Sequence, residues 1–262
     1  MTKIEPRVVP YSYLRAVYDF LRDFGDEGLE ETLAERFVVK AARLDALIPE
    51  SLKNLANYEN SRENFLSPSY KRKSRSLTDK KFAEWLVAAL RLENSPVFSD
   101  DIASFHTVAF EVSPLRTTGS VWEYGSPASN SGAGGIDVLA MSSGYPCLPC
   151  VCEIKSAQDR GAVLALIQAL AYSMELVTEN QRHRLQKFYP KAFDRISTIE
   201  GPFVDIAIIG ESTKEMKGLE QARKIVTALQ SPKNNELGKY VRNIMLLKAK
   251  RLPHNRVEIS KA

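Results

Sequence analysis

The sequence predicts an α/β fold, a mixed central β-sheet flanked by helices, preceded by a helical N-terminal region. Residues 1–75 contain only helical periodicity and polar segments. From residue 76 onward, amphipathic helical stripes alternate with short apolar runs of strand length, which is typical of a sheet covered by helices. We therefore divide the chain into an N-terminal helical region with a basic linker, 1–75, and an α/β domain, 76–262.

The N-terminal region is predicted to contain two helices and a connecting segment. Apolar side chains recur at helical spacing in residues 11–24, and a second stripe runs from Glu27 to Leu47, where Pro49 ends it. Residues 50–76 are polar and are predicted to form a linker or a long surface loop. No residue pattern in this region indicates chemistry.

The α/β domain is predicted to begin with a helix over 79–93, for which Thr78 is a suitable N-cap. The elements expected after it are strands 107–112, 120–124, 135–141 and 149–154, helix 160–178, strand 203–209, helix 215–229 and strand 240–249. A Ser- and Gly-rich segment precedes the third of these strands. It lacks the G-K-[ST] ending of a phosphate-binding loop, so we interpret it as a connecting loop.

The composition indicates a globular protein rather than a disordered or membrane-spanning one. Hydrophobic residues make up 44% and charged residues 26% of the chain, and the formal net charge is +4. No segment approaches the roughly 18 uncharged apolar residues of a membrane helix. Three cysteines at positions 147, 150 and 152 do not form a disulfide framework and lack the fourth ligand of a structural zinc site. We therefore expect a cytoplasmic protein without a membrane partner.

The chemically informative residues lie on two consecutive predicted strands. Side-chain alternation places Glu153 and Lys155 on one face of the second strand, and Asp137 shares a face with Leu139 on the first. The short connection between the strands allows Asp137 to lie beside Glu153. Two carboxylates in apolar surroundings repel each other unless a cation binds, and hard oxygen ligands suit Mg²⁺ or Mn²⁺. An ordinary Glu153–Lys155 salt bridge is the alternative interpretation.

This arrangement resembles the PD-(D/E)XK nuclease superfamily. Asp137, in the sequence Gly-Ile-Asp, matches the family's aspartate, with Ile136 in the position of the proline. Glu153 and Lys155 match the second acid and the lysine. In the following helix, Gln168 and Tyr172 fit the Q-h-x-x-Y signature of the recombination-exonuclease branch, and their i, i+4 spacing places them on one helix face. The resemblance covers about residues 78–210.

The resemblance implies a restriction-endonuclease-like core and a Mg²⁺- or Mn²⁺-dependent catalytic site. Asp137, Glu153 and the backbone carbonyl of Ile154 would bind the metal, and Lys155 would orient or activate water. Gln168 and Tyr172 would position the substrate or a metal-bound water. The preceding helix often supplies a further acid in this family; Glu84 is the first candidate, and the alternatives are Asp79, Glu93 and Glu123.

Three basic segments, at Lys71–Lys81, Arg182–Arg195 and Lys248–Arg256, are compatible with contacts to phosphates or with ordinary solvated surface. The resulting hypothesis is a DNA nuclease of DNA repair, phage defence or a mobile element, with DNA favoured over RNA. An RNA-directed nuclease and a non-catalytic nucleic-acid-binding or assembly module remain alternatives. No helicase or methyltransferase motif is present, so another protein would supply such functions or specificity, and a homodimer is compatible with the sequence.

Overall fold

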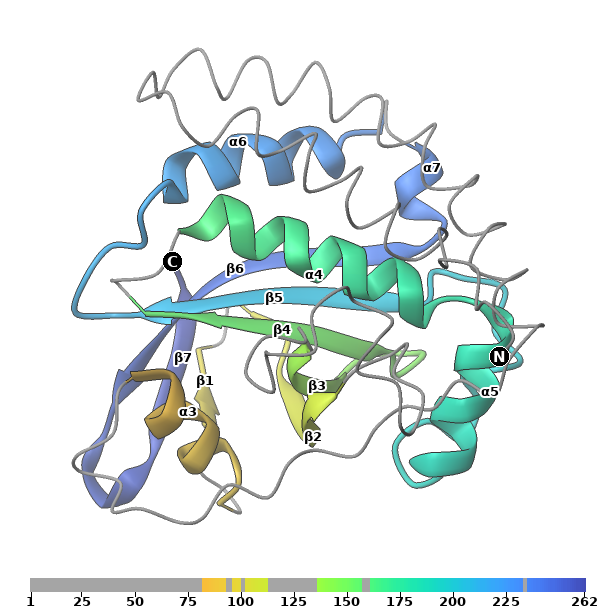
Figure 1. The fold of residues 1–262 in the computed structure, drawn as a ribbon, viewed down its shortest axis with the longest axis horizontal. Coiled ribbons are helices and arrows are strands. Elements are labelled where there is room, and N and C mark those ends of the chain that lie inside the picture. The colour runs from red at the N-terminus through yellow and green to blue at the C-terminus, as the bar shows by residue number, and fades with distance from the viewer. Residues whose placement is uncertain (1–81, 93–95, 100–101, 113–135, 157–160, 233–234) are drawn as a thin grey trace, which may run out of the picture.

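The computed structural model describes residues 82–92, 96–99, 102–112, 136–156, 161–232 and 235–262. This part of the chain is an α/β structure in which a curled, seven-stranded mixed sheet is flanked by helices (Figure 1). The predicted N-terminal helices, the linker 50–76, the strand 120–124 and the Ser- and Gly-rich segment lie outside the described residues.

The sheet has the strand order β1-β7-β6-β5-β4-β3-β2. The strands are β1 Pro96–Phe98, β2 Phe105–Val112, β3 Ile136–Ser142, β4 Pro149–Lys155, β5 Val204–Glu211, β6 Val241–Arg251 and β7 Val257–Lys261. Strands β4, β5 and β6 are parallel and form the centre. On one side β3 and β2 continue the sheet in antiparallel pairs; on the other, β7 is antiparallel to β6 and parallel to β1.

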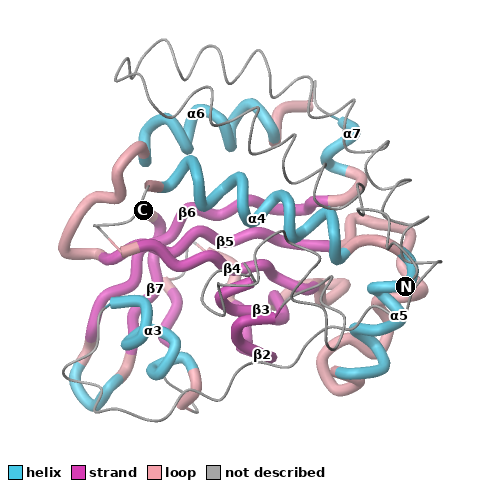
Figure 2. Tube along the Cα trace, viewed as in Figure 1, coloured by secondary structure: helices cyan, strands magenta, loops and turns pink. Residues whose placement is uncertain are grey.

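The helices connect these strands and cover both faces of the sheet. They are α3 Phe82–Leu90, α4 Ala162–Leu176, α5 Glu179–Phe188, α6 Leu219–Leu229 and α7 Asn235–Gly238, with a 3₁₀ turn at Pro253–Asn255. Helix α4 follows β4 and α6 follows β5, and the two pack on the same face (Figure 2), as expected for consecutive crossovers in a parallel sheet. Helix α3 packs on the opposite face.

The central strand β5 shows why the core divides into two clusters. Its first seven residues are all buried, which is the pattern of a parallel strand covered on both faces. Ile206 and Ile208 pack into the cluster beneath α4 and α6, whereas Ala207 and Ile209 pack into the cluster that contains α3. The site described below lies on the α4 face.

Several elements differ from the sequence-based expectation. The predicted helix 160–178 is observed as Ala162–Leu176, and a separate helix, α5, follows it. Helix α5 was not predicted because only Gln181 and Leu185 in its sequence ENQRHRLQKF are buried, so it has almost no apolar stripe. Strands β1 and β7 were also missed, since three and five residues are too short for a clear two-residue period.

None of the helices in the described part of the chain is by itself long and apolar enough to cross a membrane. The segments Ala162–Met174 and Glu179–Phe188 meet the length and composition criteria only as a pair, which is bent by 89°.

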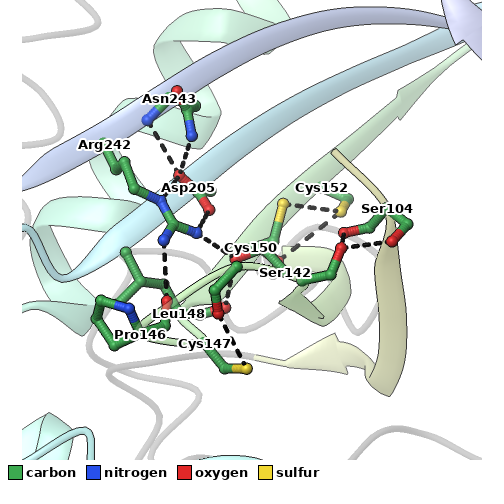
Figure 3. A network of polar contacts seen from close by, with 12 residues as sticks. Ser104, Ser142, Pro146, Cys147, Leu148, Cys150, Cys152, Asp205, Arg242 and Asn243 are labelled. Carbon is green, nitrogen blue, oxygen red and sulfur yellow. Dashed lines mark hydrogen bonds and ion pairs between the residues drawn. The ribbon is translucent and has the colours of Figure 1, made fainter. Parts of the chain in front are cut away.

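A buried ion pair joins β5, β6 and the β3–β4 loop (Figure 3). Arg242 contacts both carboxylate oxygens of Asp205, with Nη2–Oδ2 at 2.5 Å and Nε–Oδ1 at 3.2 Å. The backbone and side-chain amides of Asn243 also donate to Asp205 Oδ1, at 3.0 and 3.2 Å. Arg242 further donates to the Pro146 carbonyl and to Ser142 Oγ, at 2.9 and 2.8 Å. One guanidinium therefore ties the loop before β4 to the start of the parallel strands.

Arg242→Ala should lower the free energy of unfolding by about 3–5 kcal/mol, because Asp205, which is 1% exposed, would lose its cation in a buried position. Arg195→Ala is the matched control. Its partner is Asp194 at 3.9 Å and both side chains are about three-quarters exposed, so we expect a change below about 1 kcal/mol. Urea unfolding of the three proteins measures both effects, and equal losses in the two variants would contradict the structural role of Arg242.

Candidate active site

Strands β3 and β4 bring Asp137 and Glu153 to facing positions. The antiparallel ladder of β3 and β4 pairs Val138 with Cys152. When the same register is extended by one residue, Asp137 lies opposite Glu153. Val138 and Cys152 pack into the cluster on the α3 face. The alternation of side chains therefore directs both carboxylates to the α4 face, as the sequence predicted.

A hydrogen bond from a backbone amide to a side chain joins the two strands at this point. The amide of Ile154 donates to Asp137 Oδ2 at 2.8 Å. In a β-strand the N–H and C=O of one residue point toward the same neighbouring strand. The Ile154 carbonyl therefore lies on the Asp137 side of β4. The three predicted metal ligands, two carboxylates and one carbonyl, thus come from adjacent positions of two strands.

The side chain of Lys155, the last residue of β4, is held by contacts with β4 and α4. Its Nζ donates to Gln168 Oε1 at 2.8 Å and lies 3.4 Å from Glu153 Oε2. Helix α4 packs directly on β4 and β5, which brings the amide of Gln168 to the lysine. We expected Gln168 to position substrate or water; the structure shows Lys155 as its partner. No sequence signal could have identified this contact, because it depends on how α4 lies across the sheet.

The environment of Glu153 strongly perturbs its carboxyl group. It is 2% exposed, and one carboxylate oxygen, Oε1, is buried without a hydrogen-bond partner in the described part of the chain. Burial, and then the charge of Asp137, raise the pKa of Glu153 well above its ordinary value, although the charge and hydrogen bond of Lys155 oppose this shift. A buried carboxylate oxygen without a partner is energetically costly, and a bound cation would remove that cost.

The donor set fits a hard divalent cation. Mg²⁺ is commonly held by one or two carboxylates, with water or substrate oxygens in its other positions. Asp137, Glu153 and the Ile154 carbonyl supply oxygen only, and thiolate and imidazole ligands, which suit zinc, play no part. Among the described residues, no group of three or more His, Cys, Asp or Glu side chains that could hold a metal ion is present.

The other predicted site residues in the described part of the chain, Tyr172 and Glu84, lie on α4 and α3. Tyr172 is 6% exposed and packs in the core cluster of the α4 face, one turn from Gln168. Glu84 is half-buried on α3, whose apolar side packs into the cluster on the opposite face of the sheet from Glu153. The alternative acids Asp79, Glu93 and Glu123 lie outside the described residues. A further acid from the preceding helix therefore stays a prediction.

Two of the three basic segments lie in the described part of the chain, and Lys71–Lys81 lies outside it. Arg182–Arg195 begins on α5, which follows the C-terminal end of α4 (Figure 2). Arg182 itself has structural contacts, since its guanidinium lies 4.2 Å from the centre of the Phe203 ring and donates to the Ile199 carbonyl at 3.2 Å. The segment Lys248–Arg256 begins on β6, a strand of the parallel centre.

The raised pKa of Glu153 predicts how stability changes with pH when no metal is bound. The folded protein retains a proton that the unfolded chain releases, so wild-type stability should fall as the pH rises from the ordinary carboxyl range toward the raised pKa. Glu153→Gln cannot lose this proton and should gain stability relative to wild type over the same window. Urea unfolding in EDTA across this pH range measures the difference.

Glu258→Gln is the control, because this side chain is 39% exposed at the far side of the sheet. The difference in unfolding free energy between Glu258→Gln and wild type should change little with pH. If the difference in stability between wild type and Glu153→Gln does not change with pH, Glu153 ionises over the ordinary carboxyl pH range in the folded, metal-free protein, and its pKa is not raised.

No family model, curated protein or solved structure matches this chain. The function therefore has to be argued from the geometry of Asp137, Glu153, Lys155 and Gln168.

Proposed function

We propose that this protein is a metal-dependent nuclease that hydrolyses DNA phosphodiester bonds with a PD-(D/E)XK-type site. The observation that carries the proposal is the buried carboxylate of Glu153, which lies opposite Asp137 and beside Lys155 and has one oxygen without a hydrogen-bond partner among the described residues. The element order α3, β1, β2, β3, β4, α4, α5, β5, with helices on both faces, supports a restriction-endonuclease-like core. The preference for DNA comes from the family resemblance.

The metal site would use residues of β3 and β4. Asp137, Glu153 and the Ile154 carbonyl would bind Mg²⁺ or Mn²⁺, and the ion would supply Lewis-acid charge and a water of lowered pKa. With both carboxylates ionised, the two acids and Lys155 carry one net negative charge, which a divalent cation would reverse. Binding of a phosphate at this point should therefore depend on the metal.

Lys155 is positioned to act on the reacting groups. Its ammonium has three donors, of which one is directed to Gln168 and one toward Glu153. The remaining donor can orient an attacking water or stabilise the negative charge that develops on the phosphate. Gln168 acts through Lys155, since its uncharged amide anchors the ammonium without neutralising it. We therefore assign Gln168 as a positioning residue.

Lys155→Ala should lower the turnover of DNA about 10²–10⁴-fold, the usual range for loss of a group that transfers a proton or stabilises charge. Asp137→Asn should abolish cleavage and also the rise in melting temperature that Mg²⁺ causes in the wild type. Labelled DNA and RNA incubated with Mg²⁺, Mn²⁺ or EDTA provide the activity measurement.

Cleavage that persists in both Lys155→Ala and Asp137→Asn would contradict the assignment of the catalytic site to these residues. Cleavage of RNA alone would favour the RNA-directed alternative, and metal-dependent binding without cleavage of either polymer would favour a non-catalytic module.

Gln168→Ala should lower kcat about 10–100-fold, as is typical for loss of a residue that orients a catalytic group, with little change in melting temperature. The amide is half-buried, and Lys155 keeps its contact with Glu153. Tyr172→Phe is the companion variant, because it keeps the buried ring and removes only the hydroxyl. An unchanged kcat in Gln168→Ala would exclude a positioning role, and a reduced kcat in Tyr172→Phe would assign a role to the hydroxyl.

A further inference from the structure

Lys248, in the basic segment on β6, lies in one row with Lys155. The register pairs Lys155 of β4 with Gly210 of β5, and Gly210 with Lys248 of β6. In parallel strands, residues of one row leave the same face of the sheet. The neighbouring row confirms this, since Ile154, Ile209 and Leu247 all pack on the α3 face. Lys155 and Lys248 therefore share the α4 face with Glu153.

The space between the two lysines contains no charged side chain from the middle strand. Two strand spacings of about 4.8 Å separate their Cα atoms by roughly 9.6 Å. Gly210 lies between them, and a Cβ at that position would lie 2.4 Å from Cγ of Met216, so this methionine fills the place of the missing side chain. Glu211, the next residue of β5, leaves the opposite face by alternation. The buried side chain of Met216, which is 5% exposed, thus separates the two lysines by apolar atoms and brings no charge between them.

The same register gives Lys250 a neutralising partner but gives Lys248 none. Opposite Lys250 on β7 is Glu258, and the two form an ion pair at 3.8 Å. Opposite Lys248 is Ser260, which is uncharged. Lys248 is exposed and makes no ion pair or hydrogen bond through its side chain with any residue in the described ranges. Its charge is therefore available to an anion from outside the protein.

We propose that Lys248 binds the phosphate next to the scissile one, so that the DNA backbone crosses the carboxyl ends of β4, β5 and β6. This inference rests on the proposed nuclease function and adds the path of the substrate. Lysine binds phosphate as a point charge without fixed geometry, so Lys248 contributes affinity and position rather than sequence recognition. It is a binding residue and takes no part in the chemical step.

Lys248→Ala tests this path, and Lys250→Ala is the matched control on the same strand and face. With Ca²⁺ in place of Mg²⁺ to suppress cleavage, loss of one phosphate contact should reduce the slope of log affinity for duplex DNA against log salt by about 0.9. With Mg²⁺, the KM for DNA should rise several-fold while kcat stays near wild type. Lys250→Ala should leave the slope and the KM near wild type, and Lys248→Arg should restore both.

A small diester, bis(p-nitrophenyl) phosphate, separates this inference from the proposed function. It occupies the metal site alone, so its hydrolysis should be equal in wild type and Lys248→Ala. Wild-type protein that hydrolyses neither DNA nor the small diester would overturn the proposed function, and the binding slope would still decide whether Lys248 contacts phosphate. An unchanged slope and KM in Lys248→Ala would overturn the role of Lys248, as would an equal loss of activity on both substrates.

Discussion

The burial of Glu153 beside Asp137 is the constraint on which the site depends. A carboxylate that is 2% exposed, opposite a second acid, is unfavourable in its charged form. Lys155 offsets part of this cost, and its own position depends on Gln168 of α4. The crossover helix α4 therefore does more than cover the sheet. Through Gln168 it holds Lys155, and among the described residues Lys155 is the only cation in contact with Glu153.

Two buried acids on adjacent parallel strands differ in how fully their oxygens are paired. Asp205 receives two contacts from Arg242 and two from Asn243, so each of its oxygens is paired. Glu153 has one ion pair, at 3.4 Å, and an oxygen without a hydrogen-bond partner among the described residues. The first arrangement is complete without a ligand. The second is stabilised further by a proton, as the raised pKa of Glu153 indicates, or by a bound cation, and we therefore propose the chemistry at Glu153.

The sequence predicted those features that depend on local periodicity. The alternation in β3 and β4 assigned Asp137, Glu153 and Lys155 to one face, and the apolar run of β5 identified a buried strand. Features that depend on pairing between distant segments were not predictable. The Asp205–Arg242 pair joins residues 37 positions apart, and nothing in the pattern of either strand indicates it. Helix α5 escaped prediction because it has few buried residues.

Register also determines which surface charges are neutralised by a neighbouring strand. Lys248 and Lys250 are equivalent in sequence terms: both are exposed lysines of the same basic segment and both leave the same face of β6. Pairing with β7 sets Glu258 opposite one and Ser260 opposite the other, while pairing through β5 aligns Lys248 with Lys155. Composition does not distinguish the two lysines, but the sheet neutralises Lys250 and places Lys248 in the row of Lys155, two strands away. With both acids ionised, Asp137, Glu153 and Lys155 carry one net negative charge. A divalent cation would reverse that charge, so a bound metal would favour phosphate binding at this edge of the sheet.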